Sequence, residues 1–201
     1  LAWWAGWTSQ TQTWLWGFAG ASWVGLTAWM LLRGVQGWAL WRQNVRWVLG
    51  VLMLWLAWLA MAQARTTSVQ LLLSIFCVVW AADVFAYFFG RALGGKIIHQ
   101  KLAPTVSPGK SWEGAIGGLF GVFLMAFGWM HLEQIYQWPG ASFFMEMTQH
   151  GVFLWALSLI FLTTMSVVGD LVESLVKRSA GVKDSSKLLP GHGGVLDRLD
   201  A

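Results

Sequence analysis

The sequence predicts an all-α fold, a polytopic bundle of membrane helices with a polar site at its cytoplasmic face. Hydrophobic residues make up 57% of the 201 residues and charged residues only 11%, whereas a soluble domain carries about 25% charged residues. Several apolar runs approach the roughly 20 residues that cross a bilayer. The scarce charge is concentrated in a few places, above all in residues 170–201. We therefore expect an integral membrane protein with one transmembrane domain over residues 1–201.

Five apolar runs are the candidate membrane helices: 12–32, 47–64, 69–89, 114–130 and 151–169. Helix is expected for each, because an isolated apolar run in lipid must satisfy its backbone polar groups internally. The fourth run carries glycines four residues apart, at Gly114 and Gly118 and at Gly117 and Gly121. This spacing suits close helix packing, with a chance cluster of glycines as the alternative.

Lysines and arginines gather in alternate connections. Three lie after the first run, four in residues 91–112 and five in the C-terminal segment, whereas the two remaining connections hold only Arg65. The positive-inside rule places the cation-rich connections in the cytoplasm. Basic residues in short loops beside apolar runs indicate membrane orientation, so we expect no nucleic-acid partner.

Polar residues continue past the fifth apolar run. If the helix continues, Asp170, Glu173, Ser174 and Lys177 are spaced i, i+3, i+4 and i+7 and share one face. Such a stripe can hold a cation and a phosphate together. The alternative is a simple i,i+4 pair of Glu173 and Lys177 on a solvated helix end. Asp170 favours the first interpretation, because an acid at the membrane boundary is costly and usually functional.

A glycine-rich turn, LPGHGG at residues 189–194, follows and frees the backbone to approach a bulky anion. Asp197 and Asp200 come directly after it and are hard oxygen ligands of the kind that Mg²⁺ prefers. His192 either positions a phosphate or completes the turn. It has no cysteine or histidine neighbours for a zinc site.

A second polar cluster occupies residues 101–114, KLAPTVSPGKSWEG. Its GKS resembles the end of a P-loop, but Pro104 stands where the first glycine is required and no strand precedes it, so we reject that interpretation. The remaining prediction is an amide-rich turn that binds an anion at a helix start, with Ser107, Lys110 and Ser111. Ser111 is alternatively, or in addition, the N-cap of the fourth helix.

Asp83 lies inside the third apolar run. An intramembrane acid is a functional candidate by default. It either faces a polar cavity shared with Asp170 or pairs with a basic residue for structural reasons.

Residues 174–200 read SLVKRSAGVKDSSKLLPGHGGVLDRLD. They resemble the signature of the phosphatidate cytidylyltransferase (CDP-diacylglycerol synthase) family at every fixed position, and the similarity extends over about residues 80–201. The resemblance implies an enzyme, a nucleotidyltransferase that converts CTP and phosphatidate into CDP-diacylglycerol and pyrophosphate. It implies Mg²⁺, with room for a second cation, a multi-pass location in the bacterial inner membrane and a homodimer.

The resemblance also implies roles for individual residues. Metal binding falls to Asp170, Asp197 and Asp200, and catalysis to these acids with Ser174 and Lys177. Phosphate and substrate contacts fall to the following residues: Asp83, Ser107, Lys110, Ser111, Arg178, Lys183, Lys187, His192, Gly193, Gly194 and Arg198. The 107–111 segment binds either the nucleotide phosphates or the lipid headgroup.

Two departures from the family pattern are present. Val84 and Phe85 follow Asp83 where the family commonly has a small residue and glycine. Family members also have further membrane helices before and after this stretch, so we expect the chain to be a fragment. The alternatives are another CTP-dependent membrane lipid enzyme, such as a polyprenol kinase or an archaeal-type lipid cytidylyltransferase, and an ion or phosphate transporter.

Overall fold

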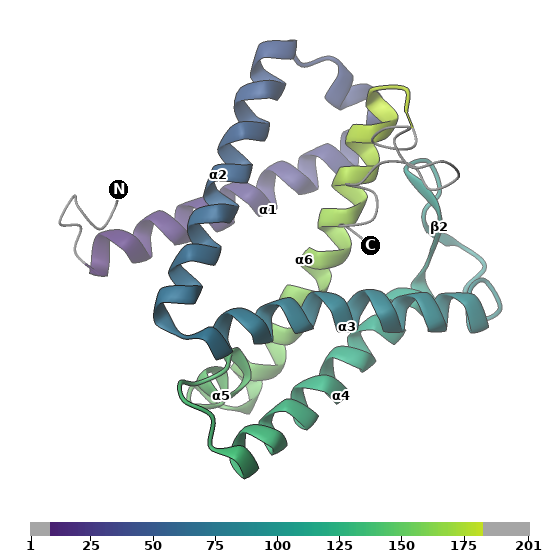
Figure 1. Cartoon of the computed structure of the whole chain (residues 1–201). Helices are drawn as coiled ribbons and strands as arrows, with labels where there is room; N and C mark the ends of the chain where they lie inside the picture. The colour runs from purple at the N-terminus through teal and green to yellow at the C-terminus, as the bar shows by residue number, and fades with distance from the viewer. Residues whose placement is uncertain (1–8, 183–201) are drawn as a thin grey trace, which may run out of the picture.

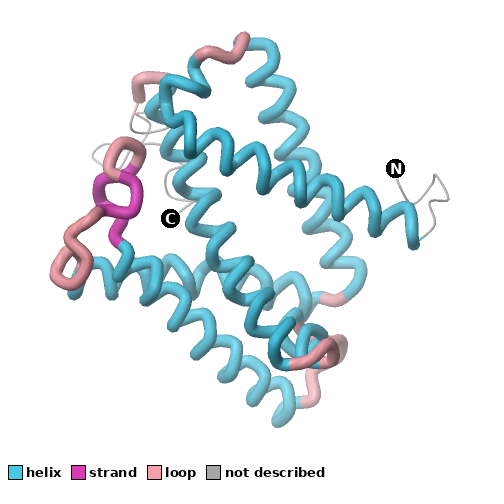
Figure 2. The backbone as a smooth tube through the Cα atoms, turned by 180° about the vertical axis from the view of Figure 1, so that it is seen from behind, coloured by secondary structure: helices cyan, strands magenta, loops and turns pink. Residues whose placement is uncertain are grey.

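The computed structural model describes residues 9–182 of the chain (Figure 1). Its elements are, in order, α1 (Ser9–Ala39), α2 (Gln43–Thr67), α3 (Val69–Leu93), β1 (Lys101–Ala103), β2 (Ser107–Ser111), α4 (Trp112–Tyr136), α5 (Phe143–Thr148) and α6 (Val152–Ser179). The antiparallel pair β1–β2 forms a small hairpin. Figures 1 and 2 both place this hairpin at the opposite end of the bundle from α5.

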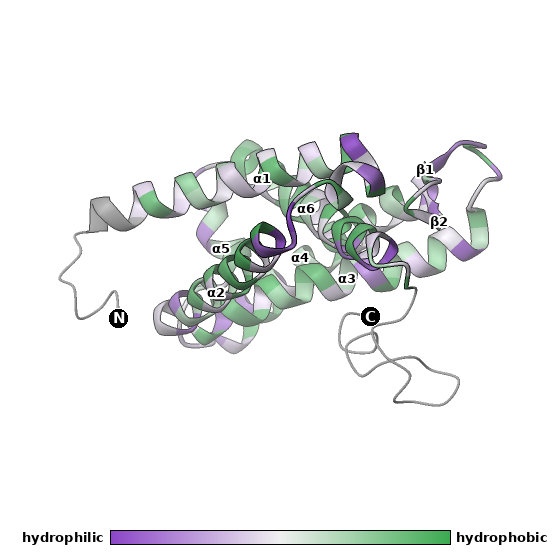
Figure 3. Ribbon diagram, turned by 90° about the horizontal axis from the view of Figure 1, so that it is seen from above, coloured by the Kyte–Doolittle hydropathy of each residue, from purple (hydrophilic) through white to green (hydrophobic). Residues whose placement is uncertain are grey.

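Five of these helices, α1, α2, α3, α4 and α6, are long and apolar enough to cross a membrane. Figure 3 colours the ribbon by residue hydropathy: hydrophobic residues predominate along these helices, and hydrophilic residues lie at the hairpin and near several helix ends. The predicted fold class, an all-α polytopic membrane protein, is confirmed. Each predicted apolar run coincides with one of the five, although the helices extend further, most of all α6, which reaches Ser179. The hairpin and the short helix α5 were not predicted from the sequence.

Helices α3 and α4 pack closely because α4 presents glycines to α3. A Cβ atom added at Gly118 would lie 2.7 Å from the backbone oxygen of Ala82, and one at Gly121 would lie 2.1 Å from the ring of Phe85. Neither separation leaves room for a side chain. The glycine spacing therefore has the packing role that the sequence suggested, and it brings the two backbones together.

One hydrophobic core lies between α3, α4, α5 and α6, and consists of Val78, Ala82, Val122, Ala126, Phe144, Trp155 and Leu159. Beside this core, a buried polar contact links the end of α4 to the start of α5. Glu133 accepts hydrogen bonds from the backbone N–H of Ser142 (3.0 Å) and from its hydroxyl (2.5 Å). The Ser142 hydroxyl in turn caps α5 by accepting from the N–H of Met145 (3.2 Å). This network anchors α5 to α4.

A second core joins the hairpin to α1 and α6, and consists of Met30, Trp38, Val106, Val172 and Leu175. Gly34 makes it possible, because α1 bends there with φ 64° and ψ −165°, a conformation that is essentially restricted to glycine. Val106, at the tip of the hairpin, is buried in this core at 4% exposure. The hairpin is thereby fixed against the C-terminal half of α6.

Candidate active site

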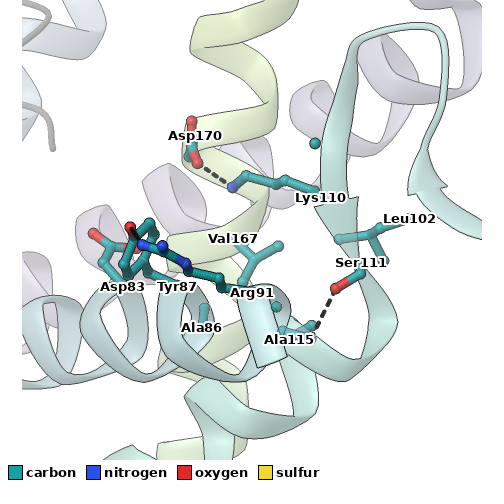
Figure 4. A pocket seen from close by; sticks show the side chains of 13 residues that line it. Asp83, Ala86, Tyr87, Arg91, Leu102, Lys110, Ser111, Ala115, Val167 and Asp170 are labelled. Atoms are coloured by element: carbon teal, nitrogen blue, oxygen red, sulfur yellow. Dashed lines mark hydrogen bonds and ion pairs between the residues drawn. The ribbon is translucent and has the colours of Figure 1, made fainter. Parts of the chain in front are cut away.

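A polar pocket of about 450 Å³ lies where the hairpin meets α3, α4 and α6 (Figure 4). Residues of all these elements line it: Asp83, Ala86, Tyr87, Gly90, Arg91, Leu102, Gly109, Lys110, Ser111, Gly114, Ala115, Val167 and Asp170. Two carboxylates and two cations share this space. Its volume falls within the range of about 300–1,000 Å³ that is typical of small-molecule sites.

Helix α3 contributes one face of polar side chains to the pocket. Asp83, Tyr87 and Arg91 follow one another at i, i+4 and i+8 and therefore lie on one side of the helix. A guanidinium nitrogen of Arg91 donates a hydrogen bond to the hydroxyl of Tyr87 (2.9 Å). Asp83 lies ten residues before the end of α3 at Leu93, or about 15 Å along the helix axis. The pocket thus reaches from the hairpin into the membrane-spanning part of α3.

Lys110 of β2 extends across the pocket and forms an ion pair with Asp170 of α6 (Figure 4). The Lys110 side chain is 24% exposed and that of Asp170 is 47% exposed, so the pair is open to the pocket. The prediction of a turn at residues 107–111 is wrong, because these residues form strand β2, which pairs with β1. The extended backbone of β2 carries Lys110 toward α6.

The start of α4 is held by two side chains. The Ser111 hydroxyl accepts a hydrogen bond from the N–H of Gly114 (3.1 Å), which confirms its predicted role as an N-cap. The buried carboxylate of Glu113 accepts three hydrogen bonds through one oxygen, from the backbone N–H groups of the following residues: Gly95 (3.1 Å), Ile97 (3.1 Å) and Ile98 (2.8 Å). Glu113 thus fixes the connection between α3 and the hairpin.

Four of the predicted site residues line this one pocket: Asp83, Lys110, Ser111 and Asp170. Four other predicted residues, Ser107, Ser174, Lys177 and Arg178, are described but are not among its lining residues. The polar stripe predicted from Asp170 to Lys177 requires the helix to continue past the apolar run, and α6 does remain helical through Ser179. The i,i+4 alternative is also present, because Lys177 pairs with Glu173 at 2.8 Å. The roles of these four residues stay predictions.

Eight predicted residues lie outside the described residues: Lys183, Lys187, His192, Gly193, Gly194, Asp197, Arg198 and Asp200. Sequence reasoning missed Tyr87, Arg91 and Glu113. The spacing of Tyr87 and Arg91 from Asp83 would have placed them on its face of α3. Glu113 could have been recognised as a capping residue, because it is an acid in the first turn of α4. Its hydrogen-bond partners in residues 95–98 could not have been recognised from the sequence.

The donor set fits Mg²⁺ as part of a shared site. Within residues 9–182, no group of three or more acidic, histidine or cysteine side chains could hold a metal ion by itself. Asp83 and Asp170, however, both line the pocket, and Mg²⁺ is commonly held by one or two carboxylates together with substrate phosphates and water. The described residues therefore suit a magnesium ion that arrives with a polyphosphate.

The fold and the pocket define a class, a multi-pass membrane protein with a charged pocket at one end of its helix bundle. The sequence model described as "Cytidylyltransferase family" matches residues 1–201. The chain belongs to the cytidylyltransferase family.

Several bacterial proteins named phosphatidate cytidylyltransferase are similar to the chain. The protein of Haemophilus influenzae is 48% identical over 131 residues, which cover 65% of this chain and 41% of the relative. The protein of Pseudomonas aeruginosa is 39% identical over 155 residues, covering 76% of this chain and 51% of the relative. That of Staphylococcus aureus is 39% identical over 139 residues, covering 69% and 47%. The chain thus spans about half the length of these relatives. No solved structure matches it significantly.

Proposed function

We propose that the protein transfers a cytidylyl group from CTP to phosphatidate, giving CDP-diacylglycerol and pyrophosphate. The observation that carries the proposal is the pocket in which Asp83 lies beside the Lys110–Asp170 ion pair. The names of the relatives supply the reaction. A pocket that combines cations, carboxylates and an apolar wall suits a substrate pair of which one is a polyphosphate and the other a lipid.

The chemistry needs little acid–base assistance. A phosphate oxygen of the lipid, already ionised at neutral pH, attacks the α-phosphorus of CTP, and the bond from that phosphorus to the bridging oxygen breaks so that pyrophosphate leaves. The barrier is mainly repulsion between anions and the charge on the leaving group. Lys110 and Arg91 supply fixed positive charge in the pocket, and Asp170 holds the Lys110 ammonium in position.

Mg²⁺ bound with CTP would neutralise phosphate charge and stabilise the leaving pyrophosphate. In this proposal, Asp83 and Asp170 supply carboxylate oxygens to it, as do Asp197 and Asp200 of the signature segment. The cation-rich connections support a pocket at the cytoplasmic face of a bacterial inner membrane, which is part of the proposal. CTP then enters from water while the acyl chains stay in the bilayer. The family resemblance adds a homodimer to the proposal.

The test uses the protein expressed from its complete gene, purified in detergent and given labelled CTP and phosphatidate. We expect pyrophosphate release that requires both phosphatidate and Mg²⁺, and a loss of about 100-fold or more for Asp170→Asn. The Arg65→Gln variant is a control, because Arg65 lies in the last turn of α2 and does not line the pocket. Pyrophosphate release by Asp170→Asn at the unaltered rate would exclude the proposed site.

The same assay separates the related enzymes. A polyprenol kinase transfers the terminal phosphate of CTP and releases CDP, whereas a cytidylyltransferase releases pyrophosphate. An archaeal-type lipid cytidylyltransferase would also release pyrophosphate, but with a different lipid phosphate as acceptor. Formation of CDP, or activity restricted to another lipid, would overturn the assignment to phosphatidate.

A further inference from the structure

A second hollow, of about 510 Å³, lies between α1, α2 and α6 and is separate from the polar pocket. Most of its lining is apolar and includes Leu26 and Met30 of α1, Met53 of α2 and Val172 of α6. No residue in α2 is buried, so this helix encloses the hollow without packing tightly on its neighbours. The three helices are all long and apolar enough to span a bilayer, and lipid is the surrounding medium there.

One end of this hollow is polar and carries a positive charge. Gln43 and Arg46 lie there in the first turns of α2, and Ser179 lies there at the end of α6. The Nε atom of Arg46 is buried and, among the described residues, has no hydrogen-bond partner. None of the residues lining the hollow is acidic. A buried N–H donor without an acceptor is costly, and the positive charge of Arg46 favours an anion as that acceptor.

The size and the chemistry of the hollow indicate what fills it. The volume of about 510 Å³ lies within the range of about 300–1,000 Å³ that is typical of small-molecule sites. A single acyl chain is thin enough to enter the apolar part, and a phosphate attached to it would lie beside Arg46. Guanidinium groups bind phosphate strongly through charge-assisted hydrogen bonds.

We propose that the hollow between α1, α2 and α6 binds one anionic phospholipid, with an acyl chain along Met30, Met53 and Val172 and its phosphate at Arg46. This lipid is a bound component of the protein and occupies a site apart from the pocket assigned to the reaction. Binding of this lipid does not require the proposed activity.

The experiment uses the complete protein in detergent, titrated with phosphatidylglycerol and followed by native mass spectrometry. We expect retention of phosphatidylglycerol in preference to phosphatidylcholine, and an affinity about tenfold lower for Arg46→Gln. Arg42→Gln is the matched control, because it removes the same charge at the same end of α2 but Arg42 does not line the hollow. That variant should keep most of the affinity. Equal affinity of wild type and Arg46→Gln would overturn the proposal.

A second arm locates the acyl chain. Phosphatidylglycerol with a photoreactive group in its chain should label peptides that contain Met30 or Met53, and Gly50→Leu should prevent this labelling. Gly50 lines the hollow, and a Cβ added there meets nothing within 4 Å, so a leucine adds bulk to the lining without a clash at its Cβ. Gly128→Leu on α4 is equally unobstructed and serves as the control. Labelling confined to other peptides, or unaffected by Gly50→Leu, would refute the site even if Arg46→Gln failed to fold.

Discussion

Lys110 and Asp170 form an ion pair across the polar pocket, although 60 residues separate them in the sequence. Lys110 belongs to a strand and Asp170 to the last long helix. The hairpin reaches α6 because Val106 at its tip is buried against Val172 and Leu175. The hydrophobic contact of Val106 therefore determines where Lys110 lies, and this position allows the ion pair with Asp170.

Lys110→Gln should reduce the rate of pyrophosphate release by about 100-fold, because it removes a fixed positive charge from the phosphate site. Lys110→Arg should recover part of the loss. The kinetics of the complete enzyme in detergent test this, with Arg65→Gln as the matched charge removal at a distance from the pocket. A Lys110→Gln enzyme with normal kcat and KM would show that the ion pair is only structural.

Asp83→Asn should raise the Mg²⁺ concentration needed for half-maximal activity, because one carboxylate of the proposed shared site is lost. Thermal unfolding should change little, since the amide keeps the size of the side chain. A magnesium titration of wild type and variant measures the effect. If Asp83 acts only in packing, the midpoint of the titration will stay constant.

Glu113→Ala should destabilise the protein by about 3 kcal/mol, because three backbone N–H groups of the 95–98 loop lose their shared charged acceptor. Activity should also fall, since this loop leads into the hairpin. The stability is measured as the loss of folded protein on heating, detected by size-exclusion chromatography. Glu146→Ala is the control, because Glu146 is an exposed acid of α5. Equal stability of the two variants would contradict the capping role.

Gly118→Leu should destabilise the α3–α4 pair by about 1–3 kcal/mol, the usual cost of overpacking. A Cβ at this position meets the Ala82 backbone oxygen at 2.7 Å, and a backbone cannot move aside as a flexible side chain can. Gly128→Leu lies on the same helix with open space around its Cβ and should cost little. Comparable melting temperatures for the two variants would show that α3 and α4 do not depend on this close approach.

Much of the fold could be predicted from the sequence because hydropathy is a local property. Each apolar run had to be helical in lipid, and the four-residue spacing of Gly114 and Gly118 and of Gly117 and Gly121 suggested a packing face. The hairpin was not predictable in the same way. Residues 101–111 have no strong strand pattern, and they pair in the structure while Val106 is held in the core formed by α1 and α6.

The site was predictable as a set of residue types but not as an arrangement. Asp83 and Asp170 stood out because acids are rare in apolar runs, and a shared cavity was one of the two alternatives for Asp83. Arg91 was visible only as one more cation in a basic loop. Its hydrogen bond to Tyr87 and its place in the pocket follow from the face of α3 that meets the hairpin.

The sequence by itself determined the membrane class, the approximate helices and the family, because these depend on hydropathy and on residue order within short segments. Only the tertiary structure decided that Asp83, Lys110 and Asp170 share one pocket and that Arg46 faces a second hollow. Contacts between distant segments depend on how helices cross and where a hairpin tip is buried. These contacts are determined by packing over the whole bundle, which cannot be predicted from a local sequence pattern.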